Sequence, residues 1–233
     1  MNLAMHPGPF IIVGVVAFIA LLIFLTYLGN KKRMEATKAK LATLGLAMHV
    51  KPTIDEKQRV WSLVSTPTGK HMWRDGAKGI NWFAEGTLAS LPIILFEHRY
   101  STGAGKSRQI HIHTVAAAVG VRGLPRLFVR EKHLGDKLAK LFGVESISIG
   151  KQDFEKHFRI FTDDTNAIPG AFLTPGLREW LLNQPKHNCS LVTGPESLSI
   201  VLPKLISNPD EIVRFAHKPA GALAALAEQP TCM

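Results

Sequence analysis

The sequence lacks the short motifs that identify common enzyme classes. No G-x-S-x-G, H-E-x-x-H, C-x-x-C or dinucleotide-binding glycine pattern occurs in a fitting context. Cysteine is scarce as well, because Cys189 and Cys232 are the only two and lie far apart. We expect both thiols to be free, Cys189 as a small strand residue and Cys232 in a loosely held tail. The sequence therefore points to no reaction, no catalytic residue, no cofactor and no metal site.

Charge is absent from residues 10–28, which read FIIVGVVAFIALLIFLTYL. A helix needs about 20 apolar residues to cross the hydrocarbon core of a bilayer, and this run meets that length. Pro7 and Pro9 precede it, where proline suits the first turn of a helix. Tyr27 lies near the other end, where aromatic residues favour the membrane interface. We predict one transmembrane helix over residues 10–28.

Basic residues follow this run at once. They are Lys31, Lys32, Arg33, Lys38 and Lys40. Because Lys and Arg beside a span stay on the cytoplasmic side, we expect a single-pass protein of the inner membrane with its N-terminus outside. The predicted segments are an extracytoplasmic N-terminus (1–9), the span (10–28), a basic juxtamembrane helical stalk (29–52) and a cytoplasmic domain (53–233).

Two other interpretations of the apolar run fit the sequence less well. A cleaved signal peptide has a basic first region, a shorter apolar core and a small-residue cleavage site. The first nine residues contain no Lys or Arg, and no A-x-A pattern follows the run. A core helix of a soluble protein rarely continues this far without a polar face.

Acidic residues are fewer than basic ones, 18 against 28, which gives a formal net charge of +10. Such a balance favours an anionic partner, and basic residues near the inner leaflet each gain roughly 1 kcal/mol from anionic lipid. The part of the chain beyond the span is long enough to bury one ordinary hydrophobic core.

The hydrophobic pattern of this part predicts strands separated by helices. Strands are expected at 80–83, 91–100, 108–119, 124–130, 145–149, 157–161, 188–193 and 197–202. Helices are expected at 30–49, from 54, at 131–142, from 163, at 175–182 and from 209. Because the order shows no regular βαβ alternation, we predict an α+β fold, with an antiparallel sheet and helices packed on it.

Two stretches together resemble a known group of proteins. One is FEHRYSTGAGKS (96–107), and the other is LPRLFV (124–129), followed by residues 150–158 with Asp153 and Phe154. In this order they resemble a broad group of uncharacterised bacterial membrane proteins with one N-terminal span and a cytoplasmic α+β domain of unknown function. The resemblance covers roughly residues 76–202, supports the fold class and implies no active site.

The stretch STGAGKS (101–107) is close in composition to a phosphate-binding loop. That loop requires a glycine five places before Gly105, where this chain has Tyr100, and it leads into a helix. Residues 108–115 alternate like a strand instead. We therefore predict a hairpin turn that binds no nucleotide.

Three further clusters have simple structural explanations. His111 and His113 share a strand face, but a metal site needs a third ligand that the sequence does not identify, so we expect half-exposed histidines. Asp163 and Asp164 suit the first turn of a helix better than paired catalytic carboxylates. Aromatic residues near basic ones can stack on nucleic acid, but they pack a sheet equally well, and we expect no nucleic-acid partner. These aromatic residues are Trp61, Trp73, Trp82 and Phe83.

We expect a non-enzymatic accessory or scaffold subunit, anchored in the membrane, with membrane lipids and other subunits as partners. It would dock from the cytoplasmic side on a larger inner-membrane complex, of which an energy-converting complex is one example. Two alternatives stay open: an enzyme or small-ligand binder with a site that no motif marks, and a module that binds anionic lipid or nucleic acid. The residues expected to contact membrane or partner are Gly14, Ala17, Ala20, Tyr27, Lys31, Lys32, Arg33, Lys38 and Lys40.

Overall fold

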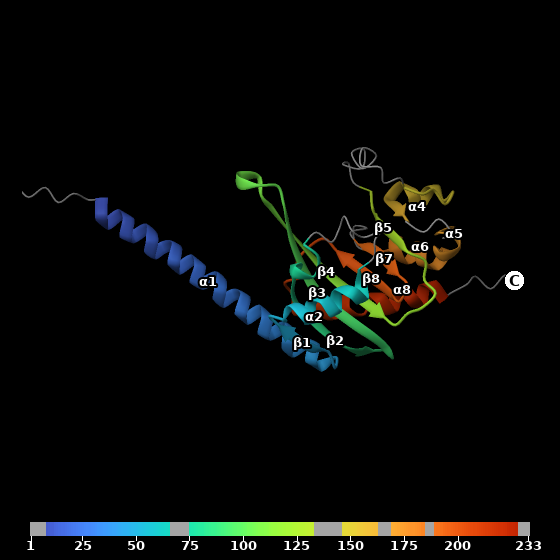
Figure 1. Ribbon diagram of the computed structural model, residues 1–233, viewed down its shortest axis with the longest axis horizontal. Helices are drawn as coiled ribbons and strands as arrows, with labels where there is room; N and C mark the ends of the chain where they lie inside the picture. The colour runs from blue at the N-terminus through green and yellow to red at the C-terminus, as the bar shows by residue number, and fades with distance from the viewer. Residues whose placement is uncertain (1–7, 66–74, 133–145, 163–168, 185–188, 228–233) are drawn as a thin grey trace, which may run out of the picture.

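The structure is a computed structural model that describes residues 8–65, 75–132, 146–162, 169–184 and 189–227 (Figure 1). Its helices are α1 (Gly8–Thr43), α2 (Ile54–Val64), α4 (Gln152–His157), α5 (Pro169–Phe172), α6 (Pro175–Leu182), α7 (Pro209–Ala216) and α8 (Lys218–Ala227). Its strands are β1 (Ala47–Val50), β2 (Ile80–Leu88), β3 (Leu91–Thr102), β4 (Gln109–Val119), β5 (Leu127–Glu131), β6 (Phe158–Phe161), β7 (Ser190–Gly194) and β8 (Ser197–Leu202). Two short 3₁₀ turns, Gly76–Gly79 and Gly105–Ser107, precede β2 and β4.

These strands form one antiparallel sheet in the order β1-β2-β3-β4-β8-β7-β5-β6. The longest pairing joins β3 to β4, from Ile93↔Ala118 to Thr102↔Gln109. Together with α1 and the other helices, the sheet confirms the α+β class that the sequence predicts.

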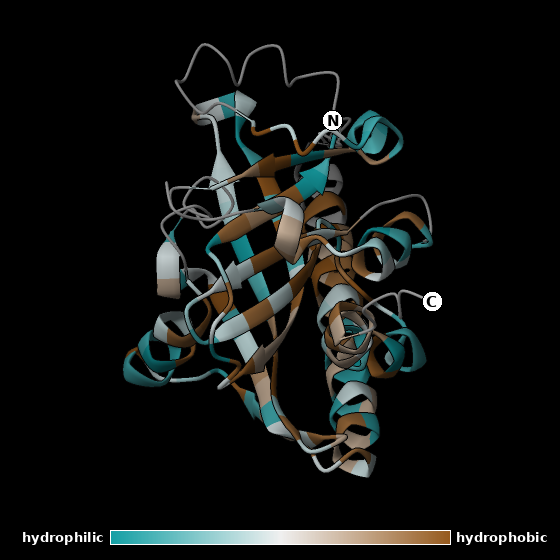
Figure 2. Ribbon diagram, turned by 90° about the vertical axis from the view of Figure 1, so that its right-hand side faces the viewer, coloured by the Kyte–Doolittle hydropathy of each residue, from teal (hydrophilic) through white to brown (hydrophobic). Residues whose placement is uncertain are grey.

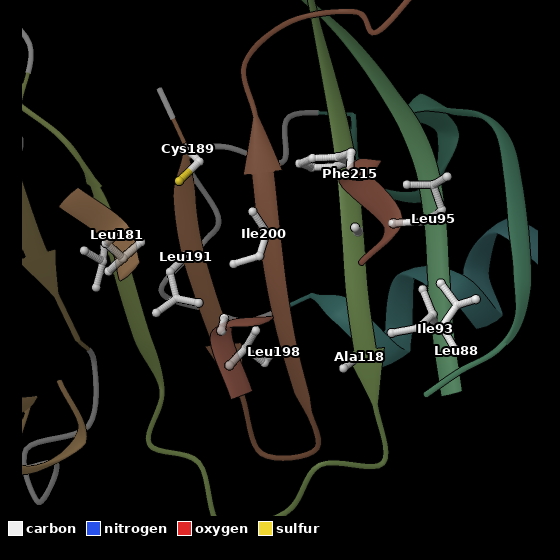
Figure 3. Close-up of a cluster of buried hydrophobic side chains, with 14 of the residues drawn as sticks. Leu88, Ile93, Leu95, Ala118, Leu181, Cys189, Leu191, Leu198, Ile200 and Phe215 are labelled. Carbon is white, nitrogen blue, oxygen red and sulfur yellow. The ribbon is translucent and has the colours of Figure 1, made fainter. Parts of the chain in front are cut away.

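The sheet has a hydrophobic layer on each face. One layer includes side chains of α1, α4, α6, α7 and α8, and Figure 3 shows part of it, with Leu95, Ile200 and Phe215 directed toward the same space. The other layer lies under α2, which contributes Val60 and Val64. In Figure 2 hydrophobic segments lie in the sheet and in helices beside it, whereas the end of the β3–β4 hairpin, near the top, is white to teal.

The helical stalk expected through residue 49 is wrong in its last part. α1 ends at Thr43, and Gly45 follows in the left-handed conformation with φ +74°. The amides of Gly45 and Leu46 donate to the carbonyls of Ala42 and Leu41, which is the Schellman pattern of a helix end. The chain then turns into the edge strand β1, so the folded domain begins before residue 53.

Local signals elsewhere predicted the elements well. The capping box of Thr53 and Glu56 is present at the start of α2, and Thr174 accepts from the amide of Leu177 at the start of α6. The β7–β8 hairpin and the start of α7 at Pro209 are also confirmed.

Some boundaries differ from the expectation. Of the strand expected at 145–149, one isolated bridge between Ile147 and Ile160 is present in the described residues, and β5 begins only after Pro125. Glu131, the expected first residue of a helix, is the last residue of β5. The rest of that helix and the helix expected from Asp163 lie outside the described residues, as does Cys232.

Candidate membrane and partner interface

From Val15 onward, the N-terminal half of α1 exposes large apolar side chains. Phe18 and Ile23 are 61% and 65% exposed, and Tyr27 is 62% exposed. In the described chain α1 is the one helix long and apolar enough to cross a membrane, and its most apolar stretch is not buried against the rest of the molecule. Figure 1 shows this half of α1 projecting away from the domain.

The C-terminal half of α1, in contrast, packs against the domain along one stripe. Arg33, Thr37 and Leu41 recur every four residues, which places them on one side of a helix. Thr37 is 2% exposed and Leu41 is fully buried in the layer shared with the sheet. α1 is therefore one continuous helix with an exposed apolar N-terminal half and a C-terminal half that packs into the hydrophobic core.

A buried carboxylate on β3 holds this stripe in place. Glu97 is 5% exposed, and its carboxylate accepts hydrogen bonds from Asn81 Nδ2 at 2.9 Å and Trp82 Nε1 at 3.2 Å. Arg33 Nη2 of α1 lies 3.5 Å from Glu97 Oε2. A buried charge is tolerated when it is paired and hydrogen-bonded, and the two donors together with the Arg33 guanidinium meet that condition.

A second ion pair joins α1 to α7 at the surface. Lys40 Nζ lies 2.8 Å from Asp210 Oδ1, and the hydrogen bond from Lys40 lowers the pKa of the Asp210 carboxyl. Asp210 also lies in the first turn of α7, where Asn208 accepts from its amide. Because both side chains of this pair are exposed, it contributes little to stability.

The structure thus divides the predicted contact residues into groups. Arg33 pairs with the buried Glu97, and Lys40 pairs with Asp210 at the surface, so both basic side chains have an ion-pair partner within the chain. Four basic side chains of α1 are exposed: Lys31, Lys32, Lys38 and, although it is paired with Asp210, Lys40. Ala17, Ala20 and Tyr27 are also exposed, and Gly14 lies in α1 where side chains are not described.

Glu97 and Asp210 were not among the contact residues predicted from the sequence. A signal for Glu97 was present, because it shares the strand face of Ile93 and Leu95, which are buried. A carboxylate at such a position predicts a basic partner from another element. Asp210 gave no comparable signal, since an acid in a first helical turn is common.

Histidine and aromatic residues form a cluster on the opposite face of the sheet. His98 and His113 are directly paired across β3 and β4 and are buried, so the expectation of half-exposed histidines is wrong for His113. His98 Nε2 donates to the Gly76 carbonyl at 3.0 Å. Burial lowers the pKa of His113 to about 4, with further lowering by the neighbouring His98 and His111.

Among the described residues, no group of three or more His, Cys, Asp or Glu side chains has an arrangement that could hold a metal ion. Tyr100 stacks on His111 with ring centroids 4.9 Å apart, and Thr102 Oγ1 lies 2.8 Å from His111 Nε2. Cys189 is free and buried, and burial raises the pKa of its thiol to about 12, so it lacks the thiolate character of a reactive cysteine.

The turn 101–107 connects two paired strands, as predicted. Gly103 has a φ of +76°, and a Cβ there would lie 2.4 Å from the Ser107 carbonyl oxygen. A strand, not a helix, follows the turn, so the helix N-terminus that holds a phosphate in a phosphate-binding loop is missing here.

Comparison with known proteins assigns no family to this chain. No protein-family model matches the chain, and no curated protein is similar to it at a significant level. Among solved structures, the crystal structure of the mycobacterial trehalose monomycolate transport factor A, TtfA, is similar with a TM-score of 0.46 and 13% identity. The match covers 84% of this chain and 97% of that chain. A likeness this distant carries no conclusion about function.

Proposed function

We propose that the protein is a membrane-anchored accessory subunit that docks on a larger membrane complex from the cytoplasmic side. In this proposal α1 crosses the inner membrane once, with the N-terminus outside. The same proposal includes a relationship to the bacterial single-span membrane proteins that residues 96–107 and 124–129 resemble.

The observation that carries this proposal is the division of α1 into two halves. Its first half exposes apolar side chains such as Phe18 and Phe24, which need an apolar environment such as lipid or another helix. Its second half is fixed to the domain through the Arg33–Glu97 pair and the buried Leu41. A domain fixed to its anchor in this way presents the same surface to any neighbour in the membrane.

Two sets of side chains on α1 suit such a neighbour. Ala17 and Ala20 are small and exposed, which lets another helix approach closely. Lys31, Lys32 and Lys38 are exposed beside the predicted membrane surface, where they can pair with acidic partner surfaces or headgroups.

Docking is tested by recovery of the partner complex in mild detergent. One variant replaces residues 10–28 with an unrelated apolar helix, and a second reverses Lys31, Lys32 and Lys38 to Glu. Arg33 and Lys40 are left intact because they hold the domain on α1. We expect each variant to recover less partner than the parent while the domain stays folded by circular dichroism.

The matched control replaces the same three lysines with Arg, which keeps their charge and should preserve recovery. If the span exchange and the charge reversal both recover the complex as the parent does, the docking proposal is wrong. Turnover of a substrate by the purified protein would also contradict it.

The proposed topology has its own test. Lys and Arg beside a span favour the cytoplasmic side, so protease added to intact spheroplasts should leave the domain whole. Digestion of the domain from outside would reverse the orientation.

A further inference from the structure

The far end of the β3–β4 hairpin is a ribbon of two strands without neighbours among the described strands. Pairing of β2 with β3 stops at Ile80↔His98, and pairing of β4 with β8 stops at Thr114↔Leu202. Pairing of β3 with β4 continues to Thr102↔Gln109. A two-stranded ribbon is marginally stable in water, so a ribbon of this length with no third strand among the described residues suggests a surface that it meets.

Contacts with α1 show toward which side this ribbon points. A Cβ at Gly86 would lie 2.4 Å from the Gly45 carbonyl oxygen, and Gly86 pairs with Ile93 of β3. Further along β3, Glu97 meets Arg33, which is nearer the N-terminus of α1. β3 therefore runs antiparallel to α1, toward the predicted membrane, and Figure 1 shows the hairpin and α1 projecting toward the same side.

The lengths of the two elements set how far the ribbon reaches. From Glu97 to Thr102 a strand advances about 16 Å. From Arg33 back to Leu28, the end of the predicted span, a helix advances about 8 Å. The end of the hairpin therefore reaches the level at which α1 enters the membrane.

The chemistry of this end fits an anionic surface. Lys106 and Arg108 are exposed at the tip, and no Asp or Glu occurs in the sequence between Glu97 and Glu131. Ile110, next to the tip, is 52% exposed. Basic side chains with an adjacent apolar one are the combination that binds the headgroup region of anionic bilayers.

We propose that the hairpin tip (Gly103–Arg108) is a second membrane contact that binds the headgroups of anionic lipids. The inference rests on the proposed function in one respect, because it requires that α1 crosses the membrane. It adds a partner and a consequence: two separate contacts, the span and the hairpin tip, fix the tilt and rotation of the domain over the bilayer.

The experiment uses the full chain in nanodiscs, with Cys189→Ala and Cys232→Ser to remove the native thiols. A fluorophore on Ala104→Cys reports quenching by lipids that carry a nitroxide on the headgroup. The same fluorophore on Ser90→Cys, in the turn at the other end of β3, is the position control. A label on Phe18→Cys with nitroxide on the acyl chain reports whether α1 is in the bilayer.

We expect quenching at Ala104→Cys in nanodiscs containing phosphatidylglycerol, less in pure phosphatidylcholine, and none at Ser90→Cys. The double variant Lys106→Gln/Arg108→Gln should lower the ratio of bound to unbound hairpin by roughly 5-fold per charge removed. The control Arg122→Gln/Arg126→Gln removes two exposed charges between β4 and β5 and should leave quenching unchanged.

The negative results of this quenching experiment can be told apart. Quenching at Phe18→Cys without quenching at Ala104→Cys would overturn the second contact and leave the anchor intact. No quenching at Phe18→Cys would overturn the anchor, the proposed function and this contact together. If the Lys106 and Arg108 variant lost a co-purifying protein while lipid quenching stayed unchanged, the tip would bind protein and the lipid proposal would be wrong.

Discussion

Glu97 and Arg33 are the two residues on which the connection between α1 and the sheet most depends. Each is charged and lies largely out of solvent, with side-chain exposures of 6% and 18%. Removal of one member of such a pair leaves the other buried without its counter-charge, which costs more than the pair itself contributes.

We predict that the substitution Arg33→Met destabilises the folded protein. It should lower the free energy of unfolding by about 2 kcal/mol, less than for a fully buried pair because Asn81 and Trp82 still donate to Glu97. Tryptophan fluorescence during denaturant unfolding of the full chain in neutral detergent measures the loss. Lys32→Met, at an exposed position, is the control and should change stability by less than about 0.5 kcal/mol.

His113 gives a pH-dependent prediction. Burial lowers its pKa to about 4 in the folded state, so between that pH and about 6.5 the unfolded chain binds more protons than the folded one. Stability should therefore fall as pH falls through this window, by roughly 3 kcal/mol at most from this group. The slope should be smaller in His113→Gln and unchanged in the exposed control His217→Gln. An equal slope in all three proteins would contradict the assignment.

Among elements, the end of α1 and the edge strand β1 depend on a close backbone contact. Gly86 of β2 lies against Gly45, and a Cβ at Gly86 would meet the Gly45 carbonyl at 2.4 Å. Gly86→Ala should therefore destabilise the chain by roughly 2 kcal/mol, because a backbone atom must move. The control is Gly170→Ala, whose Cβ would make an ordinary 3.9 Å contact with Ile149. Thermal unfolding that is equal in both variants would show that the contact is unimportant.

The turn between β2 and β3 offers a stabilising change. Ala89 and Ser90 form its two-residue loop with φ of +48° and +65°, a conformation that favours Asn followed by Gly. Ala89→Asn/Ser90→Gly should raise the free energy of unfolding by about 1 kcal/mol. A midpoint of denaturation no higher than that of the parent would contradict this prediction.

Elements defined by local chemistry could be predicted from the sequence, and elements defined by distant contacts could not. Thr53 and Glu56 satisfy each other within one turn, so the start of α2 is visible in the sequence. The end of α1 was not, because Met48 continues the helical spacing from Leu41 while Gly45 reverses the chain. The roles of Arg33 and Glu97 depend on a contact between residues far apart in sequence, for which the sequence gives only a burial signal.

At the scale of the whole molecule, one apolar helix and one α+β domain form a single unit. In the proposed function the exposed half of α1 is the membrane anchor, the Arg33–Glu97 pair and Leu41 fix the domain to it, and the hairpin tip extends toward the same side. Docking on a partner and contact with anionic lipid both require that this unit keeps one geometry.

Double electron–electron resonance in nanodiscs tests that geometry most directly. Spin labels on Lys32→Cys in α1 and Arg122→Cys beyond β4, in a chain without Cys189 and Cys232, report the distance between anchor and domain. The account predicts one narrow distance distribution, which Arg33→Met combined with Leu41→Asp should broaden. A broad distribution in the parent chain, unchanged by these substitutions, would show that the domain moves freely on its anchor and would contradict the account.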